Sequence, residues 1–306
     1  MLDQRPPRLG DSGPIQGSVR TAAPVRPPGV GDDGLGGFTL FAGPCVLEAD
    51  DLNLEVATGV KQAAGEVGLA VVFKASFDKA NRSRLGSHRG PGLSDGLRQL
   101  QRVAEDTGLR LMTDIHEPSQ AAPVAEVVDV IQIPAFLCRQ TSLLEAAGRT
   151  GMPVNVKKGQ WMSPSAMAGT VEKVARSGPG RILVTERGSA FGSDDLVVDM
   201  RNFSRLRSAT GAQVVFDGTH SVQRPGAMAD GSTGGARDQI APLVRGAVAA
   251  GCDGLFLEVH PKPRRAPSDS ECMLPLAELP RLLVQVVAIR QALGEDARSW
   301  ENNGDD

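Results

Sequence analysis

Short apolar segments rich in β-branched residues recur at a fairly even spacing, and they dominate the hydrophobic pattern of the chain. They begin at Phe38, Leu69, Leu109, Val127, Pro153, Arg181, Gln213 and Asp253. Their length and composition are those of buried strands. The pattern therefore predicts about eight strands.

Most of these segments are followed by one in which apolar residues lie three and four positions apart, the spacing of a helix with one buried face. The helix-like segments cover residues 51–68, 94–108, 141–151, 163–178, 236–251 and 275–294. Several end on a glycine, as expected at a helix C-cap. Strand and helix alternate over roughly 250 residues, which predicts an α/β fold, a (β/α)8 or TIM barrel.

Other architectures do not match this alternation. A β-sandwich or a helical bundle would contain only one kind of segment. No internal repeat indicates a solenoid, and no GxGxxG motif follows the first strand as it does in dinucleotide-binding folds.

The two ends depart from the central pattern. Residues 1–36 contain six prolines among glycines and arginines, a composition that predicts a disordered arm. Residues 294–306 are polar and acidic and are expected to fray. We therefore expect one catalytic barrel domain over residues 37–293.

Composition excludes several classes of partner. The net charge of the 306 residues is −3, which provides no global positive field for nucleic acid or an anionic membrane. No apolar run approaches the ~18 residues of a membrane span, so a cytoplasmic protein is expected. The four cysteines form no CxxC pair, against a disulfide framework or a closed structural zinc site.

Polar side chains follow the predicted strands. They are Cys45, Lys74, Ser76, Asp114, His116, Gln132, Lys157, Lys158, Gln160, Arg187, His220, Gln223, Glu258 and His260. In a parallel barrel these strand ends share one rim, where such barrels carry out chemistry. Polar residues whose only role was to keep loops soluble would be found at both the amino and the carboxyl ends of the strands. We therefore expect this set to converge on one mouth.

Cations are prominent near these strand ends. They include Lys74, Lys79, Arg82, Lys157 and Arg187. So many cations at one mouth repel each other unless an anion with several charges binds there. Arginine offers a planar fork and lysine a point charge, and both suit phosphate groups. The cluster predicts a site for phosphorylated substrates.

Ten sequence blocks resemble the signature of one family. In order, they are AGPCVLE, FKASFDKANRS, RGPGL, TDIHEPSQA, VVDVIQIPAFLCRQT, VNVKKGQ, TERG, LVVDM, VVFDGTHSVQ and LFLEVHP. They are similar to those of 3-deoxy-D-manno-octulosonate 8-phosphate synthases. The resemblance implies a (β/α)8 barrel, usually a homotetramer, that condenses phosphoenolpyruvate with D-arabinose 5-phosphate, releases inorganic phosphate and supplies lipopolysaccharide biosynthesis.

A related family, the 3-deoxy-D-arabino-heptulosonate 7-phosphate synthases, uses erythrose 4-phosphate in the same barrel. Its typical Lys-Pro-Arg-Thr block is replaced here by Lys79-Ala80-Asn81-Arg82-Ser83, which resembles the octulosonate type. Asn81 can hydrogen-bond a hydroxyl of the longer sugar, whereas proline has no side-chain donor. The heptulosonate reaction and a related phosphoenolpyruvate-dependent synthase of specialised metabolism remain alternatives.

The resemblance also implies roles for individual residues. The phosphate of phosphoenolpyruvate would be bound by Lys157, Arg187 and the backbone at Ala135, and its carboxylate and enol by Lys74, Ser76, Lys79 and Gln132. The sugar phosphate would be bound by Asn81, Arg82 and Ser83. The rest of the polar wall would be formed by Asp114, His116 and Gln160. Gln223 precedes a Gly/Ser-rich connection, residues 224–235, that we interpret as a lid, with an ordinary surface loop as the alternative.

The resemblance implies a divalent metal as well, because the metal-dependent branch of this family carries cysteine where Cys45 stands. Cys45, His220, Glu258 and Asp269 would be the ligands of iron, zinc, manganese or cobalt. The family usually continues Gly-Pro after the last carboxylate, whereas this chain reads Ser270-Glu271-Cys272, so Glu271 is a competing ligand. A second departure is Arg84, beside the expected sugar-phosphate site.

Two hypotheses place the protein outside this enzyme class. A catalytically silent sensor of sugar phosphates would keep the anion clamps but not the metal ligands and Gln160, all of which are present. An interaction scaffold built around the Pro-rich arm, with the barrel as its platform, is the second alternative, and intact activity after deletion of residues 1–36 would exclude it.

Overall fold

The computed structural model describes residues 35–82, 86–190, 192, 195–224, 226 and 233–294. Most of the predicted N-terminal arm and acidic tail lie outside these residues. So do Ser83, Arg84 and most of the predicted lid. The predictions for these positions therefore remain predictions.

Eight parallel strands within the described residues close into a barrel, as the alternating pattern predicts. They are β1 (Thr39–Gly43), β2 (Ala70–Lys74), β3 (Arg110–Asp114), β4 (Val130–Ile133), β5 (Val154–Lys157), β6 (Ile182–Glu186), β7 (Gln213–Asp217) and β10 (Gly254–His260). Neighbours in the chain pair in sequence, and β1 pairs with β10 to complete the ring. The predicted (β/α)8 fold is confirmed.

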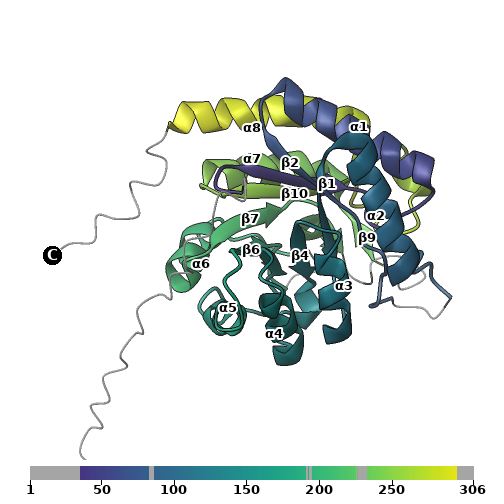
Figure 1. The fold of residues 1–306 in the computed structure, drawn as a ribbon. Helices are drawn as coiled ribbons and strands as arrows, with labels where there is room; N and C mark the ends of the chain where they lie inside the picture. Colours follow the sequence, from purple (N-terminus) through teal and green to yellow (C-terminus); the bar gives the residue numbers. More distant parts are fainter. Residues whose placement is uncertain are drawn as a thin grey trace, which may run out of the picture.

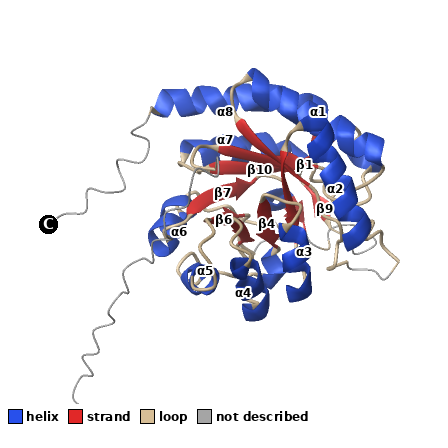
Figure 2. Cartoon of the chain, viewed as in Figure 1, coloured by secondary structure: helices blue, strands red, loops and turns tan. Residues whose placement is uncertain are grey.

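Helices form a layer around the strands (Figures 1 and 2). They are α1 (Asp50–Glu66), α2 (Leu93–Thr107), α3 (Ala121–Ala125), α4 (Thr141–Arg149), α5 (Met167–Ala175), α6 (Asn202–Thr210), α7 (Ile240–Ala249) and α8 (Leu279–Leu293). The sequence pattern did not predict α3, which is only five residues long, or α6, whose apolar face consists mainly of Phe203 and Leu206. Among the described helices, none combines the length and apolar character needed to cross a membrane.

Two short additions lie near the end of the barrel toward which the strands run. β8 (Gln223–Arg224) and β9 (Gly234–Gly235) form an antiparallel pair, and β11 (Leu274–Pro275) adds to the end of β10. β8 and β9 thus bring the two sides of the 224–235 connection together at its base.

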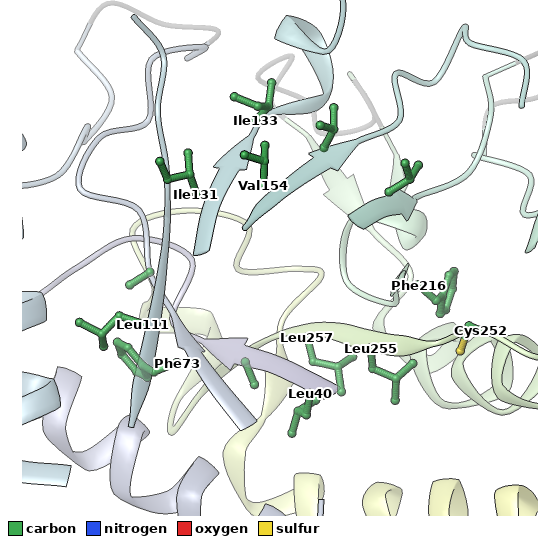
Figure 3. Close-up of a cluster of buried hydrophobic side chains, with 14 of the residues drawn as sticks. Leu40, Phe73, Leu111, Ile131, Ile133, Val154, Phe216, Cys252, Leu255 and Leu257 are labelled. Atoms are coloured by element: carbon green, nitrogen blue, oxygen red, sulfur yellow. The ribbon is translucent and has the colours of Figure 1, made fainter. Parts of the chain in front are cut away.

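The hydrophobic core divides into two clusters because successive strand residues face opposite sides. The larger cluster fills the space between strands and helices and includes Leu40, Phe73, Leu111 and Phe216 (Figure 3). The smaller one consists of Leu35, Phe41, Val72, Met112, Val130, Leu183, Val215 and Phe256. Of the eight barrel strands, all except β5 contribute a residue to it, as expected for side chains that fill the inside of the barrel.

The polar residues of the strands follow from the same alternation. Two positions beyond the apolar interior residues Val72, Met112 and Val130 stand Lys74, Asp114 and Gln132. The same step of two leads from Val215 to Asp217, and from Phe256 to Glu258. Consequently an apolar layer inside the barrel is followed, toward the carboxyl ends of the strands, by a polar one.

Candidate active site

A cavity of about 510 Å³ opens at the carboxyl ends of the strands. The predicted site residues that line it are Lys74, Lys79, Asn81, Arg82, Asp114, His116, Gln132, Ala135, Lys157, Gln160, Arg187, His220, Gln223 and Asp269. Side chains from positions as far apart as 74 and 269 thus lie at one mouth of the barrel. Ser76, Cys45 and Glu258 are buried and do not line the cavity.

Lys157, at the end of β5, is buried on one side of this cavity and held by a carboxylate. Its Nζ donates to Asp217 Oδ2 (2.7 Å) and lies 3.5 Å from the centroid of the Phe256 ring. Burial lowers the pKa of Lys157, while Asp217 favours its charged form. The ammonium is therefore held in place before any ligand binds.

Asp217 was not among the predicted site residues, although it is the last residue of β7 and links two that were. Its Oδ2 is also 2.8 Å from His220 Nδ1, and its Oδ1 accepts the backbone N–H of His220 (2.8 Å). Burial alone would raise the pKa of Asp217, but His220 and Lys157 hold it well below its usual value. Its position at a strand end was the signal that could have identified it.

Arg187 presents an uncompensated part of its guanidinium group. Its Nη2 donates to His220 O (3.2 Å) and Gln223 Oε1 (2.6 Å), whereas its buried Nη1 finds no acceptor among the described residues. Burial lowers the pKa of Arg187. A buried donor without a partner is costly, so an anion in the cavity would stabilise it.

A second group of polar side chains lies at the ends of β2 and β3. Lys74 Nζ donates to Ser76 Oγ (2.9 Å), which donates to Asp114 Oδ1 (2.5 Å). Asp114 Oδ2 is 3.1 Å from His116 Nε2. Burial alone would raise the pKa of Asp114, but Lys74 and His116 keep it well below its usual range. These carboxylate contacts orient Lys74 and His116.

The predicted sugar-phosphate arginine, Arg82, is anchored at the rim. Its Nε donates to His88 O (2.8 Å) and its Nη1 to Ser268 Oγ (2.7 Å). The buried Nη2 has no acceptor among the described residues. Arg82 therefore resembles Arg187: each guanidinium is fixed on one side and lacks a partner on the other.

Three of the four predicted metal ligands form a compact group. One ligand atom each of Cys45, Glu258 and Asp269 lies within 4.8 Å of the others. Cys45 Sγ donates to Asp269 Oδ2 (3.1 Å). His220 lies beside the group, its Nε2 3.6 Å from Glu258 Oε1, but is not part of it. Glu271, the competing ligand, is also outside this group.

These residues fit a divalent metal ion. Glu258 is fully buried, and neither of its carboxylate oxygens accepts a hydrogen bond from the described part of the chain. Lys74 and Lys79 are 3.7 and 3.8 Å from its Oε1, at ion-pair distance only. A thiol with two carboxylates and a nearby imidazole suits a transition metal of intermediate softness.

The Cys45 thiol is protonated in this arrangement. Burial raises its pKa well above the usual value, and the neighbouring Glu258 raises it further. Lys79 favours the thiolate but does not outweigh these effects. Because a metal binds the thiolate, metal binding must release a proton from Cys45.

Asp269 has φ of +51°, in the left-handed region that aspartate tolerates better than most residues. Its carbonyl accepts the N–H groups of Cys272 (2.8 Å) and Met273 (3.2 Å). Arg237 donates to the carbonyls of Ser270 and Met273 on the same loop. The Ser270-Glu271-Cys272 sequence thus still presents Asp269 to Cys45.

Two strand-end residues do not converge on the mouth, contrary to expectation. Lys158 follows the inward-facing Lys157 and is buried on the opposite side of the strand, 3.3 Å from Glu186 Oε1. His260 Nε2 is 3.3 Å from Glu48 Oε1. Neither Lys158 nor His260 lines the cavity, so their polar contacts serve the fold.

The fold and this cationic cavity together define a barrel enzyme of the class that binds phosphorylated substrates. The profile of the DAHP synthetase I family matches residues 30–295, and the chain belongs to this family.

Similar proteins are named 2-dehydro-3-deoxyphosphooctonate aldolase. The protein from Syntrophotalea carbinolica is 53% identical over 250 residues, which cover 82% of this chain and 90% of the relative. The one from Nitratidesulfovibrio vulgaris is 54% identical, with 82% and 91% covered. The one from a Cyanothece species is 52% identical over 256 residues, with 84% and 93% covered.

Proposed function

We propose that the protein condenses phosphoenolpyruvate with D-arabinose 5-phosphate and water to give 3-deoxy-D-manno-octulosonate 8-phosphate and inorganic phosphate. One observation carries the proposal: Arg82 and Arg187 line the same cavity, and each keeps a buried guanidinium nitrogen without an acceptor among the described residues. Two such donors call for two anionic groups. The name shared by the relatives describes the same eight-carbon product.

The phosphate of phosphoenolpyruvate would lie at the ends of β5 and β6, and its carboxylate and enol would extend toward the ends of β2 and β4. The phosphate would be bound by Arg187, Lys157 and the backbone at Ala135. The carboxylate and enol would be bound by Lys74, Lys79 and Gln132, and Ser76 would orient Lys74. The cavity lining contains five cationic side chains but only two carboxylates, Asp114 and Asp269. This excess of positive charge supports the binding of two phosphorylated molecules.

Arabinose 5-phosphate would enter over the loop after β2. Arg82, with Ser83, would bind its phosphate, and Asn81 a sugar hydroxyl. This orients the aldehyde toward the enol carbon of the other substrate. The broader family includes heptulosonate synthases, but the shared name of relatives at about half identity favours the octulosonate product over the alternative.

The reaction requires orientation more than a covalent nucleophile. The enol carbon of phosphoenolpyruvate forms a bond to the aldehyde carbon, whose oxygen takes up a proton. Water adds to the neighbouring carbon, and the resulting intermediate breaks its carbon–oxygen bond to release phosphate and leave a ketone. Fixed cations that hold both anions in register can supply much of the rate enhancement.

Asp114, His116 and Gln160 are suited to position the water. A hydrogen bond from His116 Nε2 to Asp114 leaves Nδ1 of the neutral ring as an acceptor. Both that nitrogen and Gln160 Oε1 are buried without hydrogen-bond partners among the described residues. Each would accept a proton of a water molecule bound between the substrates.

Cys45, Glu258 and Asp269, with His220 beside them, would hold a divalent metal ion. Such an ion, whether iron, zinc, manganese or cobalt, would polarise the aldehyde oxygen as a Lewis acid. The support is the compact donor set and the unpartnered Glu258 carboxylate.

The protein is proposed to work in the cytoplasm, where phosphoenolpyruvate and sugar phosphates are found, and to supply lipopolysaccharide synthesis. It is also proposed to form a homotetramer.

Phe136 and Trp161 support a subunit interface beside the mouth. They are 56% and 53% exposed, and their rings stack with centroids 6.0 Å apart. Exposed aromatic pairs of this kind are common in subunit contacts. Light scattering on the wild type and on a Phe136→Ser/Trp161→Ser variant tests this: a single-chain mass for the wild type contradicts it.

Phosphate release from phosphoenolpyruvate tests the reaction. We expect release with arabinose 5-phosphate, little with erythrose 4-phosphate, and loss of activity after treatment with a strong chelator that is reversed by added metal. Equal or greater rates with erythrose 4-phosphate would support the heptulosonate reaction instead. Activity that survives complete removal of metal would contradict the ligand assignment.

A further inference from the structure

Asp269 lies at the centre of a hydrogen-bond network that reaches both arginines of the cavity. On one side, Gln223 Nε2 donates to its Oδ1 (2.7 Å), and Arg187 Nη2 donates to Gln223 Oε1 (2.6 Å). On the other side, Ser268 Oγ donates to its Oδ2 (2.9 Å), and Arg82 Nη1 donates to Ser268 Oγ (2.7 Å). One carboxylate of the metal group is therefore joined to both anion sites.

The direction of each hydrogen bond is fixed by chemistry. A guanidinium can only donate and an ionised carboxylate can only accept, so the Gln223 amide must turn its oxygen to Arg187 and its nitrogen to Asp269. The Ser268 hydroxyl must accept from Arg82 and donate to Asp269 for the same reason. Each linking residue thus has one arrangement that satisfies both partners.

The Asp269 carboxylate depends on these links for its orientation. Its backbone is held by the Cys272 and Met273 N–H groups, which leaves the side chain to be set by its own contacts. Within the described residues, its carboxylate accepts hydrogen bonds from Gln223 on Oδ1 and from Ser268 and Cys45 on Oδ2. Gln223 and Ser268 hold it in the orientation that faces the Cys45 sulfur.

We propose that Gln223 and Ser268 are positioning residues that couple occupancy of the two anion sites to metal binding at Asp269. An anion bound to the unpartnered Nη1 of Arg187 fixes the orientation of that guanidinium. The guanidinium then orients the Gln223 amide, and the amide orients the Asp269 carboxylate. An anion on the unpartnered Nη2 of Arg82 acts in the same way through Ser268. The inference rests on the proposed function, which supplies the two anions and the metal.

The coupling is reciprocal by thermodynamic linkage: each anion tightens metal binding by the factor by which the metal tightens binding of that anion. Direct attraction between anion and metal adds to this factor in every variant. What the links contribute is therefore seen as a difference between variants. The two links also predict selectivity, because each one serves a different anion.

Co²⁺ binding, followed through its visible absorption, tests this without turnover. Its affinity is measured for the full chain alone, with phosphoenolpyruvate alone, and with arabinose 5-phosphate alone. For wild type we expect each anion to tighten Co²⁺ binding about fivefold or more. Gln223→Leu should reduce the factor for phosphoenolpyruvate by at least about twofold and spare that for arabinose 5-phosphate, and Ser268→Ala should do the reverse.

Each variant is the matched control for the other, since both remove one hydrogen bond to the same carboxylate. Factors unchanged in both variants would overturn the proposal. So would equal losses for both anions in each variant, which would indicate general loosening of the loop. Failure of wild type to bind Co²⁺ would overturn it together with the ligand assignment. A missing condensation reaction, by contrast, would contradict the proposed function and leave these binding factors measurable.

Discussion

Lys157 and Lys158 are adjacent lysines at the end of β5, and both are buried, but they face opposite sides of the barrel wall. Lys157 lines the cavity and pairs with Asp217, whereas Lys158 lies behind the wall and pairs with Glu186. Glu186 and Arg187 at the end of β6 repeat the division in mirror image. The alternation of side chains along a strand, and not the kind of residue, decides which charge serves the ligand.

The two sides also differ in how fully their polar atoms are satisfied. Lys158 Nζ lies within 3.5 Å of three carbonyl oxygens, of Gly159, Met162 and Gly188, in addition to Ser189 Oγ and Glu186. Arg187 keeps Nη1 without an acceptor among the described residues. The side behind the wall is complete without a ligand, and the cavity side is not.

The largest expected effect comes from Lys158→Met. It leaves Glu186 buried without its cation, which should lower the free energy of unfolding by about 3–5 kcal/mol. Chemical denaturation measures this. Adding Glu186→Gln to the same chain removes the unpaired charge and should recover part of the loss. A Lys158→Met protein as stable as wild type would contradict a structural role for this pair.

Arg187→Met should produce the opposite pattern. Because the burial of Arg187 is not fully compensated, its removal should not destabilise the protein, but kcat/KM should fall by about 10²–10³. Steady-state kinetics and denaturation are measured on the same sample. Arg149→Met, on the exposed surface of α4, is the control and should leave both unchanged. An Arg187→Met enzyme with normal kinetics would exclude the proposed phosphate site.

Metal affinity should rise with pH. The pKa of Cys45 is raised in the folded protein, so below it each metal ion bound displaces one thiol proton, and affinity should increase roughly tenfold per pH unit above about pH 7. Co²⁺ titration at several pH values checks the slope. Cys45→Ser should bind more weakly and lose most of the dependence. A flat profile in wild type would argue against a thiolate ligand.

The smallest effect is expected from Thr185→Val, inside the barrel beneath the cavity. Thr185 Oγ1 donates to Asn155 Oδ1 (2.7 Å), and both residues are fully buried. Loss of this hydrogen bond should lower stability by about 1 kcal/mol with little change in kcat/KM. A large kinetic loss would instead extend the catalytic layer deeper into the barrel.

The barrel was predictable from sequence because its strands and most of its helices carry strong periodic patterns. α3 and α6 were missed, since one is too short and the other too polar for periodicity to identify. Alternation along β5 and β6 separates Lys158 from Lys157, but a rule based on strand ends alone groups them together. Nine of the fourteen residues that this rule selects line the cavity.

The pairing of cations with carboxylates could not be predicted from the sequence. The cations were expected to repel one another until an anion bound, yet Asp217 and Glu258 already neutralise part of their charge. Hydrogen bonds such as that from Gln223 to Asp269 join residues that are 46 positions apart in the chain. They depend on the tertiary structure, and spacing alone does not reveal them.

Arg187 and Arg82 are proposed to bind two different phosphates in one cavity. A crystal structure with phosphoenolpyruvate and the unreactive alcohol arabinitol 5-phosphate would show where each phosphate lies. We predict the phosphate of phosphoenolpyruvate within hydrogen-bond distance of Arg187 Nη1 and that of the sugar within hydrogen-bond distance of Arg82 Nη2. Either phosphate bound outside the cavity, or both at the same arginine, would contradict the account.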